Sequence, residues 1–155
     1  MMKKRMFVWM LAFVFVLSMI SLTLAQETKP AEPAWKKTVV QEWVNKAKAE
    51  VKKATWEDVK KVIDKKENAI ILDVRDPDEY AAGHLPGAIN VSRGRLEFMI
   101  LDKVKDQNAK IYAHCRAGDR CALAVKTLYA MGYKNAVAVD AKFEDWVKAG
   151  NPVVR

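Results

Sequence analysis

Three short apolar runs alternate with helical patterns along this chain, and this alternation restricts the fold more than any other feature. The runs are AIILDV (69–74), KIYAH (110–114) and NAVAVD (135–140). AIILDV is a continuous apolar run of strand length, which fits a strand buried on both faces, and the other two runs are also predicted to be strands. Helical segments separate the runs. The sequence therefore predicts an α/β fold, a three-layer sandwich with a central parallel sheet flanked by helices.

The helices around these strands are predicted from their caps and their apolar periodicity. Thr55, with Asp58 three residues later, forms a capping box that begins one helix. Asp76 and Glu79 form a second box around Pro77 and begin a shorter helix. The remaining elements are expected in this order: a turn and short strand at 83–91, and helices at 92–105, 121–132 and 143–150. Together these elements place a single domain at residues 54–155.

The N-terminus has a different composition from the rest of the chain. MMKKR carries three positive charges and no acid, an apolar run follows from Met6, and small residues precede Gln26. This is the pattern of a secretory signal peptide at residues 1–25, cleaved after Ala25. The alternative is an uncleaved membrane anchor at residues 6–25, which is just long enough to span a bilayer. The expected location is therefore exported, periplasmic or extracellular, unless the segment remains as an anchor.

Two further segments connect this N-terminus to the domain. Residues 26–35 are rich in proline and small or polar residues, so they are predicted to be a linker. Residues 36–53 are predicted to form an extra N-terminal amphipathic helix, with lysines opposite an apolar stripe. The stripe recurs every four residues, at Trp35, Val39, Trp43, Ala47 and Val51. We expect it to pack on the domain core. The alternative is a surface for a protein partner or for self-association.

The formal net charge of +8 over 155 residues favours anionic small molecules or acidic partners. The lysines lie mostly along helical faces, which is the pattern of a solvated surface, so no nucleic-acid partner is expected. About half of the residues are apolar, and a domain of this size buries a core without needing disulfide bonds. The two cysteines, six positions apart, are therefore of chemical interest.

Both cysteines lie in HCRAGDRC (114–121), between a predicted strand and a predicted helix. A loop at this end of a parallel strand points several backbone N–H groups at one place, and the helix dipole adds partial positive charge there. Arg116 and Arg120 add full positive charges. A cysteine at the start of such a loop is expected to have a lowered pKa and to be a thiolate near neutral pH. Cys115 is therefore the predicted nucleophile.

The residues alone leave other interpretations of this loop open. Cys115 could be a buried, inert thiol, or it could form a redox pair with Cys121, which depends on how the loop curls because the spacing is not C-x-x-C. Metal binding is not expected, because His114 and the two cysteines have no familiar ligand spacing. The other histidine, His84, is distant in the sequence.

Three segments, in the same order, resemble the rhodanese domain, a sulfurtransferase fold. They are ILDVRDPDEYAAGHLPGAINV (71–91), YAHCRAGDRC (112–121) and FEDWVKAGNPVV (143–154), and the resemblance covers about residues 55–154. It implies an α/β sandwich around a parallel sheet and a six-residue active loop that begins with a nucleophilic cysteine. It also implies a persulfide intermediate, with no metal and no organic cofactor.

The mechanism that the resemblance implies is a double displacement. Cys115 attacks the outer sulfur of a donor such as thiosulfate, sulfite leaves, and a thiol acceptor (cyanide in an assay) then removes the sulfur. The implied substrate-binding residues are those of the loop, whose amides hold the persulfide: Arg116, Ala117, Gly118, Asp119 and Arg120. The two arginines would bind the anionic oxygens of the donor. Asp119 is expected to face solvent or to pair with an arginine.

Four other residues match marked positions of the family: Asp73, Arg75, Glu79 and His84. We expect them to make structural polar contacts and not to donate protons, and Asp73 and Arg75 to brace the loop by charge-assisted hydrogen bonds.

The sequence departs from the family pattern at two places. Cys121 stands where the family often has serine or threonine, and Ala141 and Lys142 stand where it often has glycines. Cysteine phosphatases use H-C-x5-R, whereas the arginine here follows the cysteine after four residues. The leading interpretation is an exported sulfurtransferase. The alternatives are a thiol-disulfide redox protein that uses Cys115 and Cys121, and a non-catalytic partner-binding module on the same fold.

Overall fold

A computed structural model describes residues 33–155 of the chain, and residues 37–155 form one compact unit. The predicted signal peptide, its anchor alternative and most of the predicted linker lie outside the described residues. Among the helices from residue 33 onward, none combines the length and the apolar character that crossing a membrane requires.

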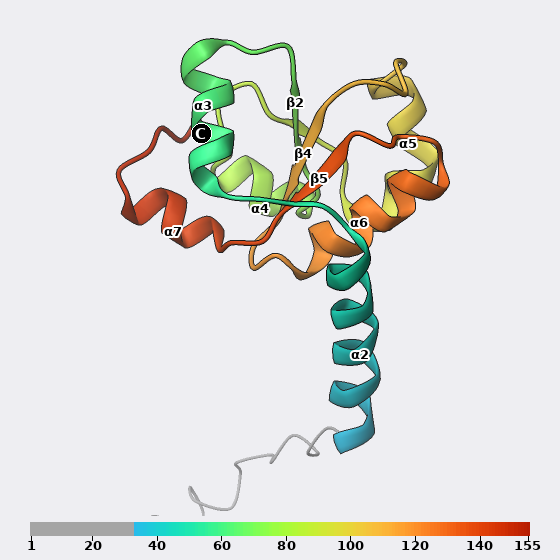
Figure 1. Ribbon diagram of the computed structural model, residues 1–155. Coiled ribbons are helices and arrows are strands. Elements are labelled where there is room, and N and C mark those ends of the chain that lie inside the picture. The colour runs from blue at the N-terminus through green and yellow to red at the C-terminus, as the bar shows by residue number, and fades with distance from the viewer. Residues whose placement is uncertain (1–32) are drawn as a thin grey trace, which may run out of the picture. The chain divides into compact units, whose positions relative to one another are not determined.

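Five parallel strands form the centre of the fold (Figure 1). They are ordered β1-β5-β4-β2-β3, so β4 lies in the middle, between β5 and β2. All four residues of β4 are buried, as expected for a strand covered on both faces. The predicted α/β class with a parallel sheet is confirmed. The strand bounds are β1 Lys53–Ala54, β2 Ile70–Asp73, β3 Ile89–Asn90, β4 Ile111–His114 and β5 Ala136–Val139.

Helices cover both faces of this sheet (Figure 1). The core of one face is built with residues of α2, α5 and α6, and the core of the other with residues of α3 and α7, with α4 on the same side. These two apolar layers hold the sheet in the middle of the sandwich. The helix bounds are α2 Ala34–Glu50, α3 Trp56–Lys65, α4 Pro77–Ala82, α5 Leu96–Lys103, α6 Asp119–Ala130 and α7 Phe143–Lys148, with a 3-10 turn η1 at Arg93–Arg95.

The predicted capping residues begin their helices. The hydroxyl of Thr55 accepts a hydrogen bond from the N–H of Asp58, and the Asp58 carboxylate accepts one from the N–H of Thr55, so the capping box of α3 is complete. The Glu79 carboxylate likewise accepts from the N–H of Asp76 at the start of α4. Helix α6 begins at Asp119, two residues before the predicted start, because Gly118 takes the cap position.

The predicted helix at 36–53 corresponds to α2, which ends earlier than expected, at Glu50. Lys53 and Ala54 form the edge strand β1 instead, paired in parallel with β5. The N–H of Ala138 donates to the carbonyl of Lys52 at 2.9 Å. The prediction that the helix continues to residue 53 is therefore wrong, because backbone groups needed by the sheet cannot also stay in a helix.

The apolar stripe of α2 is divided between the core and the surface. Ala47 and Val51 of the stripe are buried, together with the neighbouring Val44, which agrees with the prediction that the stripe packs on the core. The earlier part of the stripe does not follow that prediction, because Val39 is 48% exposed and Trp43 is 72% exposed. Only the last turns of α2 lie against the domain. The apolar periodicity of the sequence therefore extends over more of the helix than the domain covers.

Candidate active site

The loop between β4 and α6 surrounds the sulfur of Cys115 with hydrogen-bond donors. Cys115 directly follows β4 and is 1% exposed. Its sulfur accepts hydrogen bonds from the backbone N–H groups of Ala117, Gly118 and Cys121. Gly118 has φ +87°, a left-handed conformation that turns the chain into α6. The loop is therefore a cradle of N–H groups at the N-terminus of a helix, suited to an anion.

The Cys115 thiol has a strongly lowered pKa. The largest cause is the hydrogen bond from the Cys121 side chain, and the three backbone N–H groups add to it. Burial acts in the opposite direction, because a buried thiolate loses its hydration. The sum lowers the pKa of Cys115 from 9.0 to about 6, so the group is a thiolate at neutral pH.

Cys121 is a buried thiol within donating distance of several acceptors. Its sulfur lies 3.1 Å from the carbonyl oxygen of Gly118 and 3.3 Å from that of Val139. The hydrogen bond to Cys115, followed by burial, raises the pKa of Cys121 well above its ordinary value. Both cysteines are free, and the lowered pKa of Cys115 and the raised pKa of Cys121 make Cys121 the hydrogen-bond donor and Cys115 the acceptor.

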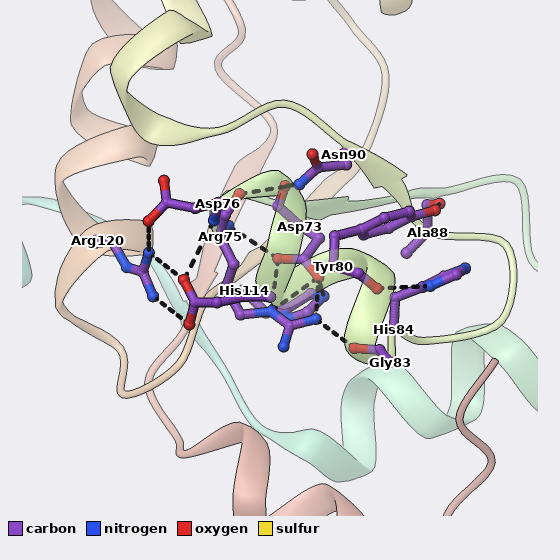
Figure 2. A network of polar contacts seen from close by, with 11 residues as sticks. Asp73, Arg75, Asp76, Tyr80, Gly83, His84, Ala88, Asn90, His114 and Arg120 are labelled. Atoms are coloured by element: carbon purple, nitrogen blue, oxygen red, sulfur yellow. Dashed lines mark hydrogen bonds and ion pairs between the residues drawn. The ribbon is translucent and has the colours of Figure 1, made fainter. Parts of the chain in front are cut away.

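Arg120, at the end of the loop, is held by two carboxylates of the α4 N-terminus (Figure 2). Its two terminal nitrogens lie 2.6 and 2.9 Å from the carboxylate oxygens of Glu79, and one of them lies 3.0 Å from Asp76. The bond to Arg120 is the largest cause of a lowered pKa at Glu79. Glu79, predicted as a structural contact, therefore fixes the last residue of the active loop.

The other two charged residues of the loop differ in their pairing. Arg116 is exposed, and its guanidinium has no ion-pair partner within residues 33–155. Asp119 is half-exposed, and its carboxylate lies 3.0 Å from the ammonium of Lys48 in α2. Asp119 faces solvent, which is one of its two expected positions, and its ion-pair partner is Lys48 and not an arginine. Helix α2 places a lysine at the loop, and Arg120 is already bonded to Glu79.

Asp73 and Arg75 form a buried ion pair next to the loop (Figure 2). The guanidinium lies 2.6 Å from the Asp73 carboxylate, donates to the carbonyl of Gly83, and stacks 4.0 Å from the ring centre of Phe143. The N–H of Phe143 donates to the carbonyl of Arg116. The charge-assisted hydrogen bonds expected of Asp73 and Arg75 join these two residues to each other and to Gly83, and Phe143 connects them to the loop.

His114, the last residue of β4, is fully buried and uncharged. Burial is the largest cause that lowers its pKa to about 4, and it outweighs the nearby carboxylate of Asp73. Neither ring nitrogen has a hydrogen-bond partner among the described residues, and the ring packs against Trp56 and Phe143. His114 is therefore a poor base at neutral pH, although it adjoins the nucleophile.

His84 lies away from the loop and contacts α4. Its Nδ1 is 3.1 Å from the carbonyl oxygen of Tyr80, and its ring stacks on the Tyr80 ring at 3.8 Å. Its backbone bridges to Val154 near the end of the chain. This position fits the predicted structural contact. No group of three metal-ligating side chains gathers anywhere in the described part of the chain.

Sequence reasoning missed two residues beside the loop, Lys48 and Asp140. Asp140 follows β5, and its carboxylate lies 3.0 Å from Lys48. The sequence carried a signal for Asp140, because it ends a buried strand as Asp73 does, and such strand ends meet at one edge of the sheet. Lys48 carried none, since it is one of many lysines on its helix.

Comparison with known proteins places this loop in a known family. Residues 55–149 match the rhodanese-like domain. The thiosulfate:glutathione sulfurtransferase of Saccharomyces cerevisiae is 29% identical over 129 residues, which cover 76% of this chain and 91% of that protein. The putative sulfur carrier protein YrkF of Bacillus subtilis is 32% identical over 87 residues, 56% of this chain. The match spans only 46% of that relative's length.

Among solved structures, the polysulfide-sulfur transferase homodimer of Wolinella succinogenes is similar in fold and sequence. It superposes with a TM-score of 0.65 at 27% identity, and the match covers 76% of this chain and 88% of that one.

The burial of His114 predicts acid sensitivity. Its pKa is about 4 in the folded chain and 6.5 when exposed, so the unfolded chain binds more protons between these values. The contribution of neutral His114 to the free energy of unfolding should be complete above about pH 6.5. It should decrease by about 3 kcal/mol as the pH falls through 4. Urea unfolding at a series of pH values should show a smaller loss in His114→Gln than in the wild type. Equal losses in His114→Gln and in the control His84→Gln would contradict this assignment.

Proposed function

The chain belongs to the rhodanese-like domain family of sulfurtransferases, and on this premise we propose that it moves a sulfane sulfur from an anionic donor such as thiosulfate to a thiol acceptor through a persulfide on Cys115. The observation that carries this proposal is the environment of Cys115. A thiol with a pKa of about 6 is a nucleophile at neutral pH. The N–H donors that converge on it are suited to binding an anion.

In the first step, the Cys115 thiolate attacks the outer sulfur of thiosulfate. A sulfur–sulfur bond forms to Cys115 while the bond between the two donor sulfurs breaks, and sulfite leaves with that electron pair. Arg116 is the residue that we propose for binding the donor oxygens, because it is exposed and its guanidinium has no ion-pair partner in the described residues. Arg120 is bonded to Glu79 and Asp76, so we assign it to holding the loop and to offsetting negative charge there.

In the second step, an acceptor thiolate attacks the outer sulfur of the persulfide. The new bond joins acceptor and sulfur, and Cys115 leaves as a thiolate that the N–H groups of Ala117, Gly118 and Cys121 stabilise again. The low pKa of Cys115 makes it a good leaving group. No protein acid or base is required in either step, which agrees with the neutral, buried state of His114.

The redox alternative receives less support from the geometry. A disulfide would join Cys115 to the neighbouring Cys121, but the raised pKa of Cys121 makes it a weak nucleophile. Its contacts with Gly118 and Val139 fit a hydrogen-bond donor. We therefore propose that Cys121 stabilises the Cys115 thiolate, in the place where the family often has a hydroxyl.

Sulfur transfer from thiosulfate to cyanide by residues 26–155 tests this proposal. Cys115→Ser should lose activity by at least about three orders of magnitude, because serine is not ionised at neutral pH. Cys121→Ser is the matched control and should keep activity within about tenfold, since a hydroxyl also donates a hydrogen bond. Thiosulfate alone should leave the wild type one sulfur atom heavier. An inactive reduced wild type that readily forms a Cys115–Cys121 disulfide would establish the redox alternative instead.

We also propose that the chain is exported, on the pattern of MMKKR and the apolar run that precedes Gln26. Expression of the full sequence in a Gram-negative host should give a periplasmic protein. Its intact mass should equal that of a chain that begins at Gln26. A chain that retains residues 1–25 in the membrane fraction would support the anchor alternative.

The exposed half of α2 is the surface that we propose for a protein partner. Val39, Val40 and Trp43 are exposed there, next to a hollow of about 440 Å³ that Trp43, Leu123 and Ala130 help to line. The Wolinella succinogenes structure is a homodimer, so we propose a second copy of this chain as the partner. Sedimentation equilibrium should give a dimer mass for the wild type and a monomer mass for Trp43→Glu. A monomeric wild type would refute this pairing.

A further inference from the structure

Lys48 connects helix α2 to the active loop. Its ammonium lies 3.0 Å from Oδ1 of Asp119, within the loop, and 3.0 Å from Oδ1 of Asp140, after β5. Lys53 lies 3.0 Å from the other carboxylate oxygen of Asp140. The Lys48 side chain is 25% exposed, so water screens these contacts less than those of a free surface lysine. One side chain thus joins three separate parts of the fold.

These charges lie directly against the backbone that holds the nucleophile. A Cβ atom placed on Gly118 would be 2.8 Å from Oδ1 of Asp140 and 3.5 Å from Nζ of Lys48. The N–H of Gly118 is one of the donors to the Cys115 sulfur. The Lys48–Asp140 pair therefore packs on a residue whose orientation decides whether the thiolate keeps that hydrogen bond.

The two carboxylates would oppose an anionic reaction if they were left uncompensated. Asp119 and Asp140 each add a negative charge beside a loop that must hold a thiolate and receive an anionic donor. The charge of Asp140 reaches the loop interior, where it raises the pKa of Cys121, and the charge of Lys48 lowers it. Burial lowers the pKa of Lys48, but its bonds to both carboxylates outweigh this and raise it overall. Lys48 thus stays charged and offsets the carboxylates.

We propose that Lys48 is a positioning residue of the active site, which fixes the Gly118–Asp119 part of the loop and cancels its carboxylate charge so that an anionic donor can reach Cys115. Lys48 precedes residues 55–149, which match the rhodanese-like domain, so the site of this chain extends to a helix outside the matched segment. The proposal rests on the proposed function only for the identity of the donor. The electrostatic effect of Lys48 applies to any anion that approaches Cys115.

Alkylation of Cys115 tests this electrostatic effect without an assay of sulfur transfer. The two reagents are iodoacetate, which is an anion, and iodoacetamide, which is neutral and of similar size. Lys48→Met should lower the ratio of the two rates by about three- to tenfold, which corresponds to one uncompensated charge near the loop. Lys46→Met is the matched control, because it removes the same charge from an exposed position of the same helix that has no ion pair among the described residues. Its ratio should equal that of the wild type.

Two further variants separate charge from position. Lys48→Arg should restore the wild-type ratio, and Asp119→Asn added to Lys48→Met should recover much of it, because the exposed carboxylate is then gone. In the thiosulfate reaction, Lys48→Met should raise KM by more than it lowers kcat. An unchanged alkylation ratio in Lys48→Met, or an equal change in Lys46→Met, would overturn the proposal. A Lys48-dependent ratio in a chain that transfers no sulfur would instead refute the proposed function and keep the assignment of Lys48.

Discussion

The negative charge on the buried sulfur of Cys115 is the constraint on which the rest of the site depends. A buried charge is costly unless hydrogen bonds replace its lost hydration. Three backbone N–H groups and the Cys121 thiol supply these bonds. They converge because Gly118 adopts a left-handed conformation and α6 starts immediately after it. The loop can begin at a fixed point because β4 is buried on both faces of the sheet.

A second set of charges surrounds this cradle, and each member comes from a different element. Glu79 of α4 is bonded to Arg120, and Lys48 of α2 is bonded to Asp119, so two of the loop's three charged side chains are compensated by elements outside it. Arg116 remains as an exposed positive charge at the loop. This distribution favours binding of an anionic donor at Arg116. The paired residues fix the conformation of the loop.

The charged residues around the loop distinguish this site from a generic member of its fold. A fold supplies the position of a site, and side chains around it supply the chemistry. Here the strand ends and the helix N-terminus belong to the part that matches the family, whereas Lys48 lies before it. Asp140 lies within the matched part and forms an ion pair with Lys48. The extra helix is thus joined to the reacting loop as well as to the core.

The sequence by itself determined the elements that short-range physics controls. Apolar runs predicted the buried strands, the Thr55 box began α3 where expected, and the position of Cys115 between a strand and a helix predicted a thiolate. Tertiary structure alone decided which charges meet, because ion pairs such as Lys48 with Asp119 join residues far apart in the chain. It also decided where α2 stops packing, since the repeat of Val39, Trp43 and Ala47 is regular although only Ala47 is buried. Periodicity states which residues share a face of a helix, and only the packed domain shows how much of that face is covered.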